Sequence, residues 1–135
     1  MFAGSVFTHV AEFEESLLQE LMRVIRSGGL LLASIHPERA WENLGNGSDL
    51  GLSGFLTENP HRAEPMGVEP VTIELFREPM PADRVVVSLT TYPINNHFTF
   101  HTRGWIERRW AAHHDVVDVI EHGHGRRQDL VVVRA

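Results

Sequence analysis

Histidine is the residue type in this sequence that most directly suggests chemistry, because its side chain titrates close to neutral pH. His36 directly follows the apolar stretch Leu30–Ile35, which places it at the end of an expected strand. There it can contact a substrate or act as a general base. The alternative is a solvated loop histidine with no role in chemistry. Both interpretations remain open from the sequence.

Two further pairs of histidines invite a metal-binding hypothesis. His113 and His114 are adjacent, so on a helix they point about 100° apart and cannot easily share an ion. His122 and His124 can share one on a hairpin loop, but a third ligand would have to come from a nearby aspartate, Asp115 or Asp118. We therefore predict no metal site.

Two G-x-G patterns could indicate a nucleotide-type turn, in which the backbone approaches a ligand closely. Gly45-Asn46-Gly47 follows a helix-like segment, and Gly123-His124-Gly125 lies between two strand-like segments. Neither has the strand–turn–helix context that the motif requires. Both are interpreted as turn glycines, so the sequence shows no glycine-rich cofactor turn.

Composition limits the classes of protein that need to be considered. The 135 residues suffice for one domain, and 42% of them are hydrophobic, which supports a packed core. The net charge is −6 and every basic residue is arginine, so we expect no nucleic-acid partner. No apolar run reaches the roughly 18 residues of a membrane span, and no signal peptide is evident. Without cysteine, the chain fits a cytoplasmic location.

The first 44 residues predict a strand, a helix and a second strand. FAGSVF, residues 2–7, has the character of the end of a buried strand. Helical spacing of leucines predicts a helix over residues 11–26, which Gly28-Gly29 ends. Glu12, Glu14 and Glu15 are assigned to its solvated face. Leu30–Ile35 is then expected as a buried parallel strand, and Glu38–Leu44 as a short helix.

The rest of the chain divides at about residue 97. Glycine and proline interrupt residues 45–97, so we expect an insertion of loops and short strands, with strands at Val71–Leu75 and Arg84–Leu89. In residues 98–135 we expect Thr102 to cap a helix that reaches about His113. Two closing strands are expected to follow, at Val116–Glu121 and Leu130–Arg134, joined as a hairpin. The tryptophans of the helix, Trp105 and Trp110, are expected to pack in the core.

Two blocks of the sequence resemble class I S-adenosylmethionine-dependent methyltransferases. SVFTHVAEFEESLLQELMRVIRSGGLLLAS, residues 5–34, resembles the family's strand 4, helix and strand 5, where "SVFTHL" precedes "WLxELxRVLxPGGxLLLT". Ser27 stands where the family has proline. FTFHTRGWIERRWAAHHDVVDVIEHGHGRRQDLVVVRA, residues 98–135, resembles its C-terminal "FHS" segment, tryptophan-bearing helix and closing "QDLVVL" strand. The resemblance covers about half of the chain, in the right order.

The resemblance implies an α/β fold that is the C-terminal half of a Rossmann-like seven-stranded methyltransferase sheet. The chain would supply strands 4 to 7, with the last strand inserted antiparallel. It would lack the first-half glycine turn and the ribose-binding acidic residue that hold most of the cofactor. Residues 1–135 would then form a partial domain of three parts: a strand–helix–strand block (1–44), an insertion or substrate lid (45–97), and a C-terminal helix and hairpin (98–135).

The resemblance also assigns candidate site residues. Ser5, Val6 and Phe7 would line the cofactor S-adenosylmethionine, whereas Thr8 and His9 would face the reacting methyl group. The alternative is that Val6 and Phe7 belong to the core and that His9 is a surface residue at the entry to the helix. His9 and His36 are the candidate catalytic residues.

The segment before the second block offers further substrate contacts. Tyr92, Asn95, Asn96 and His97 precede the FTF stretch and could line a substrate lid. The alternative is an ordinary polar turn.

Two functions from different classes follow from these observations. The first is a methyltransferase that acts on a small-molecule acceptor, in a truncated or split form that is inactive alone. The second is a non-catalytic half-domain that acts as a binding or assembly partner. Strand 4 would be an exposed edge in either case, so we expect a complementary N-terminal fragment or self-association to cover it.

Overall fold

A computed structural model of the chain describes residues 1–90 and 97–135 and shows a mixed α/β protein with a seven-stranded sheet. The strands are β1 (Phe2–Ala3), β2 (Leu30–Pro37), β3 (His61–Glu64), β4 (Arg84–Leu89), β5 (His97–His101), β6 (Asp115–His124) and β7 (Gln128–Arg134). The helices are α1 (Glu14–Val24), α2 (Glu38–Gly45), α3 (Leu50–Glu58), α4 (Ile73–Arg77) and α5 (Arg103–Trp105). Two further turns are a 3₁₀ turn, η1 (Phe7–His9), and a π-helical turn, η2 (Ile106–Trp110).

The sheet has the order β3-β4-β5-β2-β7-β6, and β1 lies beside β2 off this path. β1 and β5 both run parallel to β2, β1 at Leu32 and Ala33 and β5 at His36 and Pro37. The other pairings, including β2 with β7 and β6 with β7, are antiparallel. The expected closing hairpin is therefore confirmed, although its last strand lies inside the sheet and β6 forms the edge.

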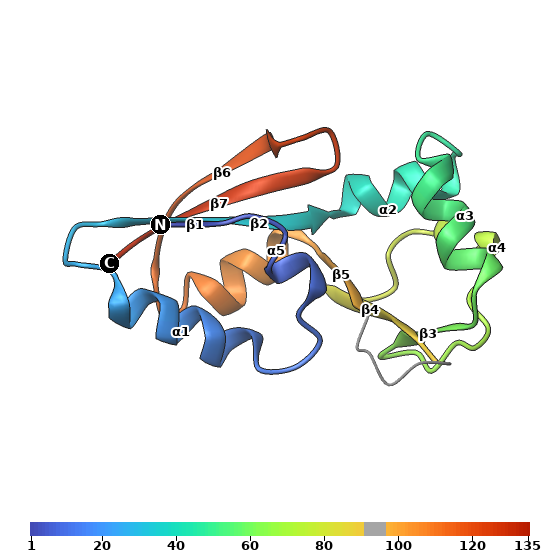
Figure 1. Ribbon diagram of the computed structural model, residues 1–135, viewed down its shortest axis with the longest axis horizontal. Coiled ribbons are helices and arrows are strands. Elements are labelled where there is room, and N and C mark those ends of the chain that lie inside the picture. The colour runs from blue at the N-terminus through green and yellow to red at the C-terminus, as the bar shows by residue number, and fades with distance from the viewer. Residues whose placement is uncertain (91–96) are drawn as a thin grey trace.

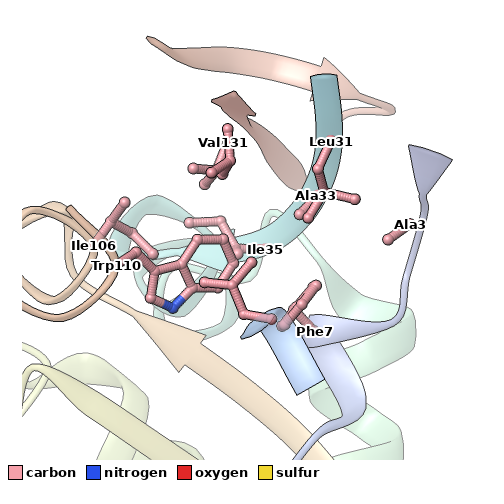
Figure 2. Close-up of a cluster of buried hydrophobic side chains, with 10 residues drawn as sticks. Ala3, Phe7, Leu31, Ala33, Ile35, Ile106, Trp110 and Val131 are labelled. Carbon is pink, nitrogen blue, oxygen red and sulfur yellow. The ribbon is translucent and has the colours of Figure 1, made fainter. Parts of the chain in front are cut away.

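Two clusters of buried apolar side chains make up the core. The first lies between α1, η2 and one face of β1, β2 and β7. Figure 1 shows α1 and α5 together beneath this part of the sheet, and Figure 2 shows Phe7, Ile35, Ile106 and Trp110 meeting inside it. The second cluster lies at the other end of the molecule, where Trp41 packs on Phe76 and Phe100 among α2, α4 and β5.

Most of the elements expected in the two end blocks are present. The helix expected over residues 11–26 is α1, the strand expected at Leu30–Ile35 is β2, and the short helix expected after it is α2. The expected helix stop at Gly28-Gly29 is wrong, because α1 already ends at Val24, where Ile25 takes an extended conformation. Gly28, with a left-handed φ of 74°, lies in the turn between α1 and β2. Thr102 caps α5, since its Oγ1 accepts a hydrogen bond from the Trp105 N–H at 3.0 Å.

The expected strand over residues 2–7 is wrong beyond Ala3. Ser5 takes a left-handed φ of 56°, and its N–H donates to Ser34 Oγ at 2.6 Å rather than to a strand partner. This turn sends the chain into η1, which carries the fully buried ring of Phe7 into the first core cluster. The side chain of Phe2, on β1, is 56% exposed, so the start of the segment is not buried either.

The middle of the chain contains more regular structure than expected. β4 is confirmed at Arg84–Leu89, but the strand expected at Val71–Leu75 is wrong, because α4 begins at Ile73. Helical winding turns Phe76 onto Trp41, at 4.7 Å between ring centroids, and that packing outweighs the strand preference of the β-branched residues. α3 and β3 were not expected from the sequence. The helix expected to reach His113 ends at Trp110.

Candidate functional site

The candidate site lies where β1 and β2 end, at the carboxyl edge of this parallel pair. Ligands bind at this edge in open α/β sheets. η1 supplies Thr8 and His9, and β2 supplies His36. Phe7 anchors η1 because its ring packs edge-on against Trp110, at 4.9 Å between centroids.

Three of the predicted histidines gather at this edge. His9 Nδ1 lies 2.6 Å from the carbonyl oxygen of His97, so Nδ1 donates this hydrogen bond. The ring of His36 is 6.4 Å from that of His9 and roughly perpendicular to it. His97 is held in turn by a 2.7 Å hydrogen bond between its Nδ1 and Ser88 Oγ. The structure thus brings together residues that are far apart in the sequence.

Two buried polar atoms at this edge have no hydrogen-bond partner among the described residues. They are Thr8 Oγ1 and His36 Nδ1, in side chains that are 0% and 4% exposed. Leaving a buried polar atom without a partner costs about 1–3 kcal/mol. Such atoms are therefore candidates for contacts with a ligand.

Burial decides what His36 can do. Burial, together with the smaller effects of the nearby His9 and His101, lowers the pKa of His36 to about 3. A side chain with this pKa is neutral at physiological pH and is a weak base, since a general base works best with a pKa near the operating pH. The interpretation of His36 as a general base is therefore disfavoured, and so is the alternative of a solvated loop histidine.

His9 is the most exposed of the three histidines. Its side chain is exposed, and it lines a cleft of about 330 Å³ together with Ala11, Glu12, Phe13 and His97. Clefts of this size accept small molecules. His9 is thus the better of the two catalytic candidates.

The residues expected to line the cofactor differ in how accessible they are. The Ser5 hydroxyl is within hydrogen-bond distance of the Gln128 side chain, at 3.3 Å from Oε1, and Val6 is 38% exposed. The ring of Phe7 is fully buried, which makes it a core residue as in the alternative interpretation. Of the expected lid residues, His97 is described above, whereas Tyr92, Asn95 and Asn96 lie outside the described residues.

The sequence interpretation missed Glu14, which was assigned to the solvated face of α1. Its side chain is 5% exposed and accepts four hydrogen bonds. Arg84 Nε and His101 Nε2 donate to Oε2 at 2.6 and 2.9 Å, and the indoles of Trp105 and Trp110 donate to Oε1 at 3.1 and 2.9 Å. Nothing in the local pattern distinguishes Glu14 from Glu15, because the hydrogen-bond donors of Glu14 come from β4, β5, α5 and η2.

Burial by itself raises the pKa of Glu14, but the hydrogen bond and charge of His101 and the charge of Arg84 outweigh it. Together they lower the pKa to about 2, so the carboxylate is ionised. Arg84 Nη2 also donates to the carbonyl oxygens of Val10 and Ala11, both at 2.8 Å. Arg84, held by Glu14, therefore fixes the segment that directly follows His9.

The described residues contain no group of three or more histidine, aspartate or glutamate side chains placed to hold a metal ion. Gly45 lies at the end of α2, where an added Cβ would be 2.1 Å from the carbonyl oxygen of Phe76. Gly125, with a φ of 66°, turns the β6–β7 hairpin. Gly47 and Gly125 are turn glycines as predicted, whereas Gly45 is a packing glycine at the end of a helix.

Fold and site define a mixed α/β protein with a histidine-lined cleft at the carboxyl edge of its parallel strands. No family model, curated protein or solved structure matches the chain. None of the described helices combines the length and the apolar character needed to cross a membrane.

Proposed function

We propose that this chain supplies the acceptor-side half of a class I S-adenosylmethionine-dependent methyltransferase domain that acts on a small molecule. The observation that carries the proposal is the arrangement of β1, β2, β7 and β6. β1 and β2 are parallel and joined by α1, and β7 lies between β2 and β6, antiparallel to both. An inserted antiparallel last strand is what the resemblance implies for this part of the family's sheet.

The residues at the carboxyl edge suit the methyl-transfer end of such a site. Ser5 and Val6 offer contacts to the cofactor, and Thr8 Oγ1 and His36 Nδ1, which have no partner among the described residues, belong to the same edge of the sheet. S-Adenosylmethionine supplies an electrophilic methyl group when bound. The acceptor would occupy the cleft beside His9, whose side chain is exposed and would face the acceptor with Nε2 while Nδ1 is held by the carbonyl oxygen of His97. Positioning of this kind supplies much of the acceleration in a displacement reaction.

The first prediction concerns binding of S-adenosylmethionine to this chain. We expect a dissociation constant of about 1 mM or weaker, or roughly −4 kcal/mol, because the glycine turn and ribose acid are not in this sequence. In a ¹H–¹⁵N NMR titration, amide shifts should be confined to residues 5–9 and 34–37. ATP, which shares the adenosine but lacks the methionine, should leave the amides of Thr8, His9 and His36 unmoved.

Val6→Arg places a bulky cation in the proposed cofactor site and should abolish these shifts. Val24→Arg, at an exposed apolar position of α1, serves as the matched control and should preserve them. A micromolar dissociation constant would contradict the division of the cofactor site between two halves. An absence of shifts at residues 5–9 near saturation would contradict the methyltransferase proposal itself.

A specific observation favours a second candidate function, self-association of a non-catalytic half-domain. Within the described part of the chain, β1 pairs only with β2. Strand alternation places Phe2, Leu30 and Ile120 on the sheet face opposite α1, and they are 56%, 43% and 43% exposed. An open edge beside an apolar face is a surface on which a second copy can dock.

The second prediction tests this surface. We expect size-exclusion chromatography to show a dimer that dissociates on dilution, and Leu30→Lys to shift it to monomer. Val24→Lys, on the helical side of the molecule, should leave the dimer intact. In the diluted protein, the amides of Phe2 and Ala3 should exchange faster than those of β2. A monomer at every concentration, with β1 amides as slow as those of β2, would contradict self-association.

A further inference from the structure

Rings make up much of the wall of the cleft beside His9. His9 and His97 line it from η1 and β5, and Phe13 lines it from the start of α1, together with Ala11 and Glu12. The blue loop that leads from η1 into α1 in Figure 1 carries residues 10–13. Burial lowers the pKa of His97, and the charge of Glu12 opposes this effect without cancelling it. The cleft therefore offers flat surfaces to a small molecule.

Phe13 has a conformation that contacts within the chain do not explain. It is the N-cap residue of α1 and takes a left-handed φ of 59°, which is unfavourable for a bulky side chain. The N-cap position also favours residues whose side chains bond to the helix, and Phe13 makes no such bond. Phe13 is 77% exposed, so packing offsets neither cost. A bulky residue kept in a strained conformation without packing is typical of a binding site.

The adjacent Glu12 brings a negative charge to the same cleft. Its side chain is exposed, and it forms no ion pair with residues 1–90 or 97–135. An aromatic ring next to a carboxylate suits a ligand that joins an aromatic body to an ammonium group, because each part then meets a matching surface.

We propose that this cleft binds a small aromatic amine, whose ring stacks on Phe13 and whose ammonium group lies beside the carboxylate of Glu12. The inference rests on the proposed function in one respect, since it makes this amine the methyl acceptor. The ring and the ammonium group serve for recognition, because an amine that Glu12 keeps protonated has no lone pair with which to accept a methyl group. Phe13 is then a specificity-determining residue that lowers the stability of the chain.

The test uses phenethylammonium as the probe, in an NMR titration of the full chain without S-adenosylmethionine. We expect saturable shifts of the amides of His9, Glu12, Phe13 and His97. Cyclohexylethylammonium keeps the charge but lacks the aromatic ring, and phenethyl alcohol keeps the ring but lacks the charge. Each should bind at least about threefold more weakly than the probe. Equal binding of either control ligand would overturn the proposal.

Phe13→Asn separates binding from a structural role of the ring. Asparagine tolerates the left-handed conformation and caps helices well, so this variant should raise the urea concentration at the midpoint of unfolding. It should also weaken phenethylammonium binding about fivefold or more, because the stacking surface is lost. If Phe13→Asn lowered the midpoint, or kept the native affinity, Phe13 would not be held in this conformation for a ligand.

Glu12→Gln tests the charge. It should weaken the binding of phenethylammonium about threefold or more and leave that of phenethyl alcohol unchanged. Glu58→Gln, which removes an exposed carboxylate of α3, is the matched control and should change neither. An equal effect of Glu58→Gln would indicate a general attraction of cations to an acidic chain and would overturn the proposal.

The result can be distinguished from the test of the proposed function. If S-adenosylmethionine shifts the amides of residues 5–9 but phenethylammonium does not bind, the acceptor class is wrong and the methyltransferase proposal stands. If phenethylammonium binds but S-adenosylmethionine shifts none of these amides, the methyltransferase proposal fails and the cleft remains a site for aromatic amines.

Discussion

Replacing Glu14 with glutamine is expected to lower the free energy of unfolding by about 3 kcal/mol at pH 7. The substitution keeps the shape of the side chain but removes the negative charge that faces Arg84, whose side chain is 16% exposed. It also turns an NH₂ group toward donors that now bond to a carboxylate oxygen. Breaking a buried ion pair from one side costs about 3–5 kcal/mol, because the other charge stays buried without its partner. Urea denaturation followed by tryptophan fluorescence measures this loss.

The stability that Glu14 contributes should decrease as the solution becomes more acidic. The pKa of Glu14 is about 2 in the folded protein, against an ordinary value of 4.5. The stabilisation from its ionised form is therefore complete above about pH 4.5 and is lost as the pH falls toward 2. The gap in unfolding free energy between the native protein and Glu14→Gln should narrow over the same interval. The native protein itself should begin to lose stability below about pH 6.5, because His36 is protonated more readily when unfolded.

Glu15→Gln is the matched control, since it changes the neighbouring residue of the same helix. Glu15 pairs with Arg109 at 2.5 Å, but both side chains are about half exposed. A surface ion pair of this kind contributes about 0–1 kcal/mol. If the two variants lost similar amounts of unfolding free energy, the ion pairs of Glu14 would not be buried in solution. The same conclusion would follow if the loss in Glu14→Gln did not change at acidic pH.

The regular elements at the two ends of the chain could be predicted because local patterns determine them. The leucines of α1 repeat at helical spacing, Gly28 marks the turn that leads to β2, and Leu30–Ile35 has no polar residue other than Ser34. Residues 45–97 follow no such pattern. α4 forms because Phe76 packs on Trp41, and β3 forms because it pairs with β4, so both depend on contacts between distant residues.

The sequence predicted the part of the site that local patterns determine and missed the part that depends on distant residues. Thr8 and His9 follow β1, and His36 lies at the end of β2, and that position alone places them at one edge of the sheet. Their surroundings could not be predicted, because the ring of Phe100 lies 5.3 Å from His36 and the carbonyl oxygen of His97 accepts from His9, and both residues come from β5. Glu14 was missed because its four donors come from beyond residue 80. The sequence predicts where strand ends lie better than it predicts what surrounds them.

Phe7→Ala is expected to lower the free energy of unfolding by about 3–5 kcal/mol, as for other large aromatic side chains removed from a core. The ring is fully buried against Trp110, and Figure 2 shows it inside the first core cluster with Ala3 and Ile35 nearby. This prediction distinguishes a core residue from one that lines a ligand. If the ring lined an empty cofactor site, its removal would cost little packing energy. If the ring belongs to the core, its removal leaves a cavity and lowers the stability.

Val6→Ala supplies the comparison, because Val6 is adjacent and 38% exposed, and its loss should be about 0.5 kcal/mol or less. Phe7→Leu keeps most of the side-chain volume and should cost about 1 kcal/mol, so it remains measurable if Phe7→Ala fails to fold. The order of stability should be native, Val6→Ala, Phe7→Leu and Phe7→Ala in chemical denaturation. If Phe7→Ala were no less stable than Val6→Ala, the ring would not be packed in solution. It would then be available to the cofactor, as the sequence interpretation first assigned it.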